Sequence, residues 1–314
     1  MAKKIYFRAD ADSQIGYGHF IRSLALADML KDDFDCVFFT KSPTIYQQEE
    51  VAKVCKLVEL PDSDDRFDLF IDMLCGDEIV VLDNYFYTID YQCKIKAKGC
   101  KLVCIDDFQD KAISCDLLIN MSVAELTDLP LVNATNKLLG LKWSLLRKEF
   151  RQNSCLLSGT LKRAMICFGG ADTLNLTQKA INAITNINGV ECIDVVIGEG
   201  KKEKDYISDS KVNFFQNLSA QEMSNLLCKS DFCVVSTSGI ALEAVSLGCK
   251  VFSGYYVDNQ LNLYNNLILN NYIYGLGDLR VNDIVLDLDL DQLQLDRLNL
   301  VNLQPEYVKI FQSL

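Results

Sequence analysis

Short apolar segments alternate with longer segments of helical spacing along the whole chain. Phe20–Lys31 and Tyr91–Lys98 repeat apolar residues at the spacing of a helix that buries one side. Strands that alternate with helices are typical of a parallel sheet covered by helices. The strands expected in the first half are Lys4–Arg8, Cys36–Thr40, Leu57–Leu60, Ile79–Leu82, Leu102–Ile105 and Leu117–Ile119.

A second series of apolar segments begins after the polar stretch Arg151–Ser154. Its expected strands are Arg163–Phe168, Glu191–Ile197, Val212–Phe215, Asp231–Ser236 and Lys250–Gly254. The chain of 314 residues fits two domains of about 100 to 200 residues each. We therefore expect two doubly wound α/β domains, residues 1–155 and 156–314, with a ligand in the cleft at the carboxyl ends of their strands.

Composition narrows the class of protein. With 49% hydrophobic and 24% charged residues, the chain has the composition of a packed globular protein. A net charge of −12 argues against an extended nucleic-acid interface, which needs a field of Lys and Arg. No apolar run is long enough for a membrane span or a signal peptide, so a cytoplasmic protein without membrane insertion is expected. Thirteen cysteines without a C-x-x-C motif favour reduced, mostly buried thiols.

The chain has a single histidine, His19. This count excludes metal sites that need two or more histidine ligands from one chain. The cysteine spacing does not indicate zinc either. We therefore expect no metal and no cofactor.

His19 follows the first strand in the segment Arg8–Arg22, directly after Gly16 and Gly18. The glycines permit a tight turn into a helix and a close approach of backbone to ligand. The segment is not a dinucleotide fingerprint, because Ile21 stands where a third glycine would be. In the first turn of a helix a neutral imidazole is favoured, and it can accept a proton. The alternative is a histidine that only caps or packs.

Three segments of the second half have the composition of ligand-binding turns. Glycine-rich helix starts bind phosphate through backbone N–H groups, and a carboxylate one turn into a helix can accept hydrogen bonds from ribose hydroxyls. An Asx-rich turn offers uncharged donors to a sugar. In each case an ordinary turn or helix cap is the alternative. The candidate nucleotide-binding residues are Gly169, Gly170, Asp172, Ser236, Ser238, Gly239 and Glu243, and the candidate sugar-binding residues after them are Asn259 and Gln260.

Taken together, these motifs resemble the UDP-2,4-diacetamido-2,4,6-trideoxy-β-L-altropyranose hydrolases of pseudaminic acid biosynthesis. The resemblance covers nearly the whole chain and implies a GT-B-like fold with two Rossmann-type domains. It implies that His19 is the catalytic base, that Tyr85 and Asn259 help to hold the substrate, and that UDP binds mainly to the C-terminal domain. The matching segments are Arg8–Arg22, Asp83–Tyr85, Ile105–Asp107, Leu145–Phe150, Phe168–Asp172, Glu243 and Asp258–Gln260.

The expected reaction is metal-independent hydrolysis with inversion, in which His19 activates water at the anomeric carbon. Asp10 is expected to orient the imidazole. Gly16, Gly18 and Arg22 are assigned to substrate binding together with Asn259 and Gln260. Two alternatives remain: a GT-B glycosyltransferase that uses a UDP-sugar, and a non-catalytic subunit that binds a nucleotide sugar.

Overall fold

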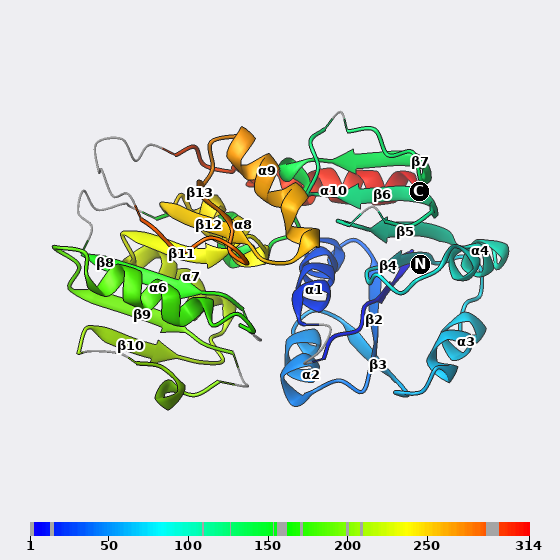
Figure 1. Ribbon diagram of the computed structural model, residues 1–314. Coiled ribbons are helices and arrows are strands. Elements are labelled where there is room, and N and C mark those ends of the chain that lie inside the picture. The colour runs from blue at the N-terminus through cyan, green and yellow to red at the C-terminus, as the bar shows by residue number, and fades with distance from the viewer. Residues whose placement is uncertain are drawn as a thin grey trace. The chain divides into compact units, whose positions relative to one another are not determined.

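The computed structural model describes residues 3–12, 16–108, 110–125, 127–152, 154–155, 162–169, 172–198, 201–207, 210–286 and 295–314. The chain divides into two compact units, Met1–Arg147 with Val301–Leu314, and Lys148–Leu300. Each unit has one parallel sheet with helices (Figure 1). The architecture of two doubly wound α/β units expected from the alternating pattern is therefore confirmed.

The first unit contains a seven-stranded parallel sheet in the order β3-β2-β1-β4-β5-β6-β7. The strand order reverses between β1 and β4, which pair directly. In open α/β sheets, ligands bind beyond the carboxyl ends of the strands at such a reversal. The strands are β1 (Lys4–Arg8), β2 (Asp35–Lys41), β3 (Lys56–Leu60), β4 (Ile79–Leu82), β5 (Lys101–Ile105), β6 (Ile113–Asn120) and β7 (Val132–Leu139).

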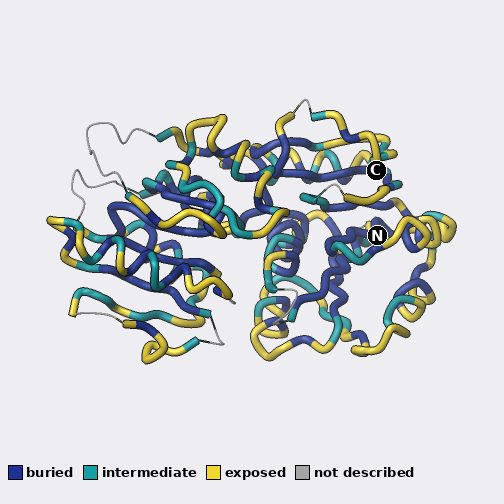
Figure 2. The backbone as a smooth tube through the Cα atoms, viewed as in Figure 1, coloured by how far each residue is buried: buried dark blue, intermediate teal, exposed yellow. Residues whose placement is uncertain are grey.

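Strand β7 lies at one edge of this sheet and was not expected from the sequence. Its segment, V-N-A-T-N-K-L-L, is mostly polar and largely exposed. An edge strand with one exposed face does not need the apolar run that marks a central strand. The central strands are buried over most of their length, as the dark blue tube in Figure 2 shows.

Helix α1 (Gly18–Leu30) begins two positions before the expected start, so that His19 is in its first turn. Most of its residues are buried, in agreement with the wide apolar stripe in its sequence. The other helices of this part of the unit are α2 (Ile45–Ala52), α3 (Asp65–Asp72), α4 (Ile89–Ala97) and the short 3-10 helix η1 (Leu141–Trp143).

The C-terminal helix α10 (Leu303–Ser313) packs on α1 of the first unit. The ring of Phe311 lies 6.4 Å from that of Phe34. Tyr307 donates a hydrogen bond from its hydroxyl to the carbonyl oxygen of Trp143 over 2.7 Å. Because of these contacts, the last residues belong to the first unit, and the division falls after Arg147. The observed units therefore differ from the expected domains 1–155 and 156–314.

The second unit contains a six-stranded parallel sheet in the order β10-β9-β8-β11-β12-β13, which reverses between β8 and β11. Its strands are β8 (Arg163–Cys167), β9 (Cys192–Val196), β10 (Val212–Phe215), β11 (Phe232–Ser236), β12 (Val251–Tyr255) and β13 (Tyr274–Asp278). Its helices are α5 (Lys148–Gln152), α6 (Leu176–Thr185), η2 (Glu203–Asp205), α7 (Ala220–Lys229), α8 (Gly239–Leu247), η3 (Asp258–Gln260) and α9 (Leu261–Leu269).

One pair of cysteines departs from the expectation of reduced thiols. Cys155 forms a disulfide with Cys228 of α7, and 73 positions separate the two in sequence. A pair so far apart leaves no local motif, so the sequence pattern could not indicate it. The other cysteines have free thiols, and most of them are buried or half-buried, as expected.

Candidate active site

His19 lies at the reversal of the first sheet, where α1 begins after β1. Its Nδ1 is 2.7 Å from Oδ1 of Asp83, the residue directly after β4. Both side chains are buried, and Asp83 has no exposed surface. The two strand ends therefore bring a histidine and a carboxylate into direct contact.

The environment of Asp83 determines the tautomer of His19. Burial alone would raise the pKa of Asp83, but the charges of Arg22 and His19 and their hydrogen bonds lower it to about 2. Arg22 donates to both oxygens from Nε over 2.7 Å and from Nη2 over 2.6 Å, and the hydroxyl of Ser23 donates over 3.0 Å. An ionised carboxylate only accepts hydrogen bonds. Nδ1 of His19 is therefore the donor, and whenever the ring is neutral, Nε2 carries the lone pair.

Arg22 also lies close to the imidazole, since its Nη2 is 3.0 Å from Nδ1 of His19. Both atoms point hydrogens at Asp83, so we describe this approach as a contact rather than a hydrogen bond. The guanidinium reaches a second carboxylate, because Nη1 donates to Oδ2 of Asp107 over 2.5 Å. Arg22 was expected to bind substrate; the structure uses its nitrogens to hold two carboxylates.

Tyr85 lies beside His19 at the same edge of the sheet. The two rings meet edge to face with centroids 4.6 Å apart. The Tyr85 hydroxyl donates to Oδ1 of Asp107 over 2.5 Å. The structure thus brings the candidates His19, Tyr85 and Arg22 together and adds two carboxylates, Asp83 and Asp107.

Asp10 does not orient the imidazole, and that expectation is corrected. Its carboxylate accepts hydrogen bonds from both terminal nitrogens of Arg8 and from the backbone N–H of Lys41. Arg8 and Asp10 are both without exposed surface. A buried guanidinium needs a carboxylate partner, and Asp10, two residues after Arg8 at the end of the same strand, supplies it. The partner of His19 is Asp83 instead.

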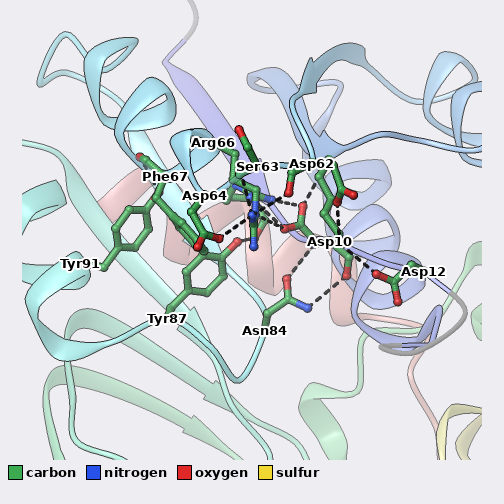
Figure 3. A network of polar contacts seen from close by, with 12 residues as sticks. Asp10, Asp12, Asp62, Ser63, Asp64, Arg66, Phe67, Asn84, Tyr87 and Tyr91 are labelled. Atoms are coloured by element: carbon green, nitrogen blue, oxygen red, sulfur yellow. Dashed lines mark hydrogen bonds and ion pairs between the residues drawn. The ribbon is translucent and has the colours of Figure 1, made fainter.

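Asp10 is the centre of a polar network that joins several strand ends (Figure 3). Asn84 accepts from the backbone N–H of Asp10 over 2.7 Å and donates to its carbonyl oxygen over 3.1 Å. Nζ of Lys41 lies 3.0 Å from both Asp12 and Asp62. The network therefore fixes the start of the loop that leads from β1 to His19.

The glycines of that loop have different roles. Gly16 has φ +81°, a conformation that favours glycine, and its N–H donates to the carbonyl oxygen of Asp12 over 2.8 Å. A Cβ atom at Gly18 would meet nothing within 4 Å. Packing within the described residues therefore does not require glycine at Gly18, and its expected contact with substrate stays a prediction.

In the second unit, Ser236, Ser238 and Gly239 lie where β11 passes into α8, again beside the reversal of the sheet. The hydroxyl oxygens of the two serines are 3.0 Å apart, and the side chain of Ser238, the N-cap residue, makes no hydrogen bond that caps the helix. A Cβ atom at Gly239 would meet nothing within 4 Å. This helix start has small residues, hydroxyls and space, as a phosphate site requires.

Glu243 is buried on α8. Burial raises the pKa of Cys167, the last residue of β8, to about 11; a backbone hydrogen bond with Gly169 opposes this shift, and the charges of Glu243 and Asp172 add to it. Asp172 itself accepts from the N–H groups of Leu176 and Thr177 over 2.7 and 3.1 Å. Both of its oxygens therefore cap α6, and the expected role of this carboxylate in nucleotide binding stays a prediction.

Gly169 has φ +81° in the turn after β8, whereas Gly170 lies outside the described residues. Asn259 and Gln260 lie in η3 after β12, as expected for a turn. Gln260 is buried and accepts from the N–H of Tyr256 over 3.0 Å, so it stabilises the turn. Asn259 is half-buried, and its expected contact with the sugar stays a prediction.

In the described ranges, no three or more His, Cys, Asp or Glu side chains form a group that could hold a metal ion. The helices that they contain are all too short or too polar to cross a membrane.

The fold of the chain matches that of solved glycosyltransferases. A glycosyltransferase of Rickettsia africae superimposes with a TM-score of 0.60 at 10% identity, covering 99% of this chain and 98% of its own. HepE of Anabaena, solved with UDP, gives a TM-score of 0.58 at 11% identity, covering 99% of this chain and all of its own. The protein therefore has the GT-B-like fold, with two Rossmann-type units.

Two curated proteins are similar in sequence. UDP-2,4-diacetamido-2,4,6-trideoxy-β-L-altropyranose hydrolase of Campylobacter jejuni is 25% identical over 267 residues, which cover 82% of this chain and 93% of the hydrolase. An uncharacterised protein of Methanocaldococcus jannaschii is 25% identical over 285 residues, and the match spans 84% of this chain but only 58% of that protein. No family model matches the chain.

The sequence alone missed the roles of Asp83 and Asp107. A usable signal existed, because each carboxylate follows an apolar strand within two residues, at the edge where ligands bind.

Proposed function

We propose that this protein hydrolyses a UDP-linked diacetamido-trideoxy sugar at its anomeric carbon, with inversion, and releases UDP and the free sugar. The observation that carries the proposal is the contact of Nδ1 of His19 with the ionised Asp83, which leaves Nε2 as a proton acceptor. The Campylobacter hydrolase supports the substrate class, because its match covers most of both chains. The released sugar would serve the synthesis of a pseudaminic-type acid.

The proposed step is a single displacement by water. The water oxygen bonds to the anomeric carbon while one of its protons moves to Nε2 of His19. The bond between that carbon and the phosphate oxygen breaks, and its electron pair leaves with UDP. The imidazolium that forms is stabilised by Asp83, which lies 2.7 Å away. One displacement without a covalent intermediate inverts the anomeric configuration.

The second unit is proposed to bind the nucleotide. The N–H groups at the start of α8 and the hydroxyls of Ser236 and Ser238 suit the diphosphate, whose developing charge they would stabilise. Glu243 would accept hydrogen bonds from the ribose, and Gly169 and Gly170 would allow the backbone to approach. These residues need no metal ion to meet a diphosphate.

The sugar contacts are proposed for Tyr85 and Asn259. Tyr85 is half-buried beside His19, so a sugar held against its ring would lie near Nε2. Gly16 and Gly18 leave room at the start of α1 for the same ligand. Arg22 and Gln260 would act by holding their neighbours in place.

Transfer to an acceptor is the second candidate function. The solved structures of similar fold favour it, since the Rickettsia protein and others are glycosyltransferases. In both reactions the base removes a proton from an oxygen nucleophile. They differ in whether water or an acceptor hydroxyl attacks.

The deciding experiment incubates the purified protein with the UDP-linked diacetamido sugar in buffer that contains EDTA and no acceptor. Release of UDP with appearance of the inverted free sugar in a time course of proton NMR is the expected result. Release that requires an acceptor would favour the transferase, and UDP binding without release would favour a non-catalytic subunit. A requirement for Mg²⁺ would contradict the metal-independent step. UDP-N-acetylglucosamine serves as the control substrate.

A further inference from the structure

The segment after β5 contacts Tyr85 at three points. Asp107 accepts from the Tyr85 hydroxyl over 2.5 Å. The ring of Phe108 lies 5.8 Å from the Tyr85 ring. Nζ of Lys111 donates to the backbone carbonyl oxygen of Tyr85 over 2.6 Å. The hydroxyl, ring and backbone of one tyrosine are thus held by Asp107, Phe108 and Lys111.

Asp107 also connects Tyr85 with the histidine. Its second carboxylate oxygen accepts from Nη1 of Arg22 over 2.5 Å, and the other nitrogens of Arg22 hold Asp83. A continuous chain of charge-assisted hydrogen bonds therefore runs from the Tyr85 hydroxyl to the imidazole. Bonds of this kind are stronger and more directional than neutral ones.

The direction of the first bond has a chemical consequence. A phenol has one proton to donate and two lone pairs. Because its proton points at Asp107, the Tyr85 oxygen can only accept a hydrogen bond from a ligand. Nε2 of His19, on the adjacent ring, is also an acceptor. The two acceptors suit a ligand that offers two hydrogens, as a water molecule does.

We propose that Asp107 is a positioning residue that fixes the Tyr85 hydroxyl as a hydrogen-bond acceptor beside His19, with Lys111 fixing the backbone of the same tyrosine. The inference rests on the proposed function, since the positioned ligand is the water or sugar of that reaction. Asp107 acts through Tyr85 and Arg22 and does not itself contact the reacting atoms.

The test replaces Asp107 by Asn. An amide of the same shape has one oxygen acceptor, so it cannot accept from both Tyr85 and Arg22. We expect kcat for UDP release to fall about 10- to 100-fold, the loss expected for one charge-assisted hydrogen bond, with little change in KM. Asp110→Asn, an exposed carboxylate on the same segment, is the matched control and should leave kcat unchanged.

A double substitution distinguishes this positioning role from a general loss of structure at the site. If Asp107 acts through the Tyr85 hydroxyl, Asp107→Asn should lower kcat little further in a protein that already carries Tyr85→Phe. Independent, multiplying losses in kcat would overturn the proposal. Lys111→Met, at an exposed position, is the second variant should Asp107→Asn fail to fold, and a lower kcat is expected from it as well.

A spectroscopic measurement needs no substrate. In protein labelled with ¹³C at tyrosine Cζ, the signal that disappears in Tyr85→Phe identifies Tyr85. This signal should move in Asp107→Asn and stay in Asp110→Asn. An unmoved signal would overturn the contact, and a moved signal with unchanged kcat would overturn the positioning role. If the wild-type protein hydrolyses no nucleotide sugar, the proposed function fails, and the Tyr85 signal still decides whether Asp107 holds the hydroxyl.

Discussion

Nδ1 of His19 and Oδ1 of Asp83 are 2.7 Å apart although 64 positions separate the two residues in sequence. Their meeting follows from the strand order, because β1 and β4 are neighbours. Asp83 directly follows β4, and His19 is in the first turn of α1, the helix after β1. The only histidine of the chain is thereby fixed in one tautomer by a buried carboxylate.

Replacement of His19 by Asn should remove the base. We expect kcat for UDP release to fall at least about 10²-fold, the scale of lost general-base catalysis, with little change in KM. Steady-state kinetics on the UDP-sugar check this. Near-normal turnover would exclude His19 as the base.

Replacement of Asp83 by Asn should disturb the imidazole without removing it. An amide presents a donor where Arg22 and His19 both donate, so the ring loses its fixed tautomer, and we expect kcat to fall by about 10²- to 10⁴-fold. NMR of ¹⁵N-histidine reads the tautomer without assignment, because the chain has one histidine. The wild type should carry its proton on Nδ1 when neutral; a proton on Nε2 would contradict the arrangement.

Asp83 should also make the free energy of unfolding depend on pH. Arg22 and His19 outweigh burial and lower the pKa of Asp83 from 3.8 to about 2 in the folded protein. A carboxyl with a lowered folded pKa stabilises the fold above its unfolded pKa, and this contribution is lost as pH falls through the folded value. Relative to Asp83→Asn, the free energy of unfolding of the wild type should therefore decrease by roughly 2 kcal/mol between about pH 4 and pH 2. Urea unfolding at several pH values measures it, and a difference that is constant over this range would contradict the prediction.

Replacement of Asp10 by Asn should lower stability rather than alter the histidine. The change leaves the buried guanidinium of Arg8 without its carboxylate, which typically costs about 3 to 5 kcal/mol. Asp62→Asn is the control, because this carboxylate is 73% exposed and such pairs contribute about 0 to 1 kcal/mol. Thermal unfolding compares the two. A changed tautomer of His19 in Asp10→Asn would show that Asp10 orients the imidazole after all, a role that the structure assigns to Asp83.

Replacement of Glu243 by Ala should weaken UDP binding in the second unit. A charge-assisted hydrogen bond is worth about 1.5 to 3 kcal/mol, or roughly 10- to 150-fold in affinity. Calorimetry with UDP should show this loss in Glu243→Ala and nearly unchanged affinity in His19→Asn. Equal losses in both variants would contradict the proposed division of labour between the units.

The elements that the sequence predicts well are those with a local signal. The buried strands and the presence of helix α1 follow from apolar runs and from the glycines before His19. Edge strand β7 has no such signal, because one face is exposed. The disulfide of Cys155 depends on a partner 73 positions away.

In the candidate site, too, the sequence predicts the features that have a local signal and not those that depend on distant residues. The sequence placed His19 correctly in the first turn of α1, since glycine spacing and helix periodicity are local. Its partner depends on which strands pair, and the sequence offered Asp10 because it is near in the chain. The pairing of β1 with β4 brings Asp83 to His19 instead. The nearer carboxylate, that of Asp10, accepts hydrogen bonds from Arg8.

The return of α10 to the first unit affects the order of folding during synthesis. The first sheet is synthesised early, but α1 has no cover from Phe311 and Tyr307 until α10 has been synthesised. The second unit is continuous from Lys148 to Leu300, so its whole sequence is available before that of the first. Since domains fold as units as the chain emerges, the unit that begins first is completed after the second, and a chain that stops before Leu303 leaves the apolar side of α1 without its cover.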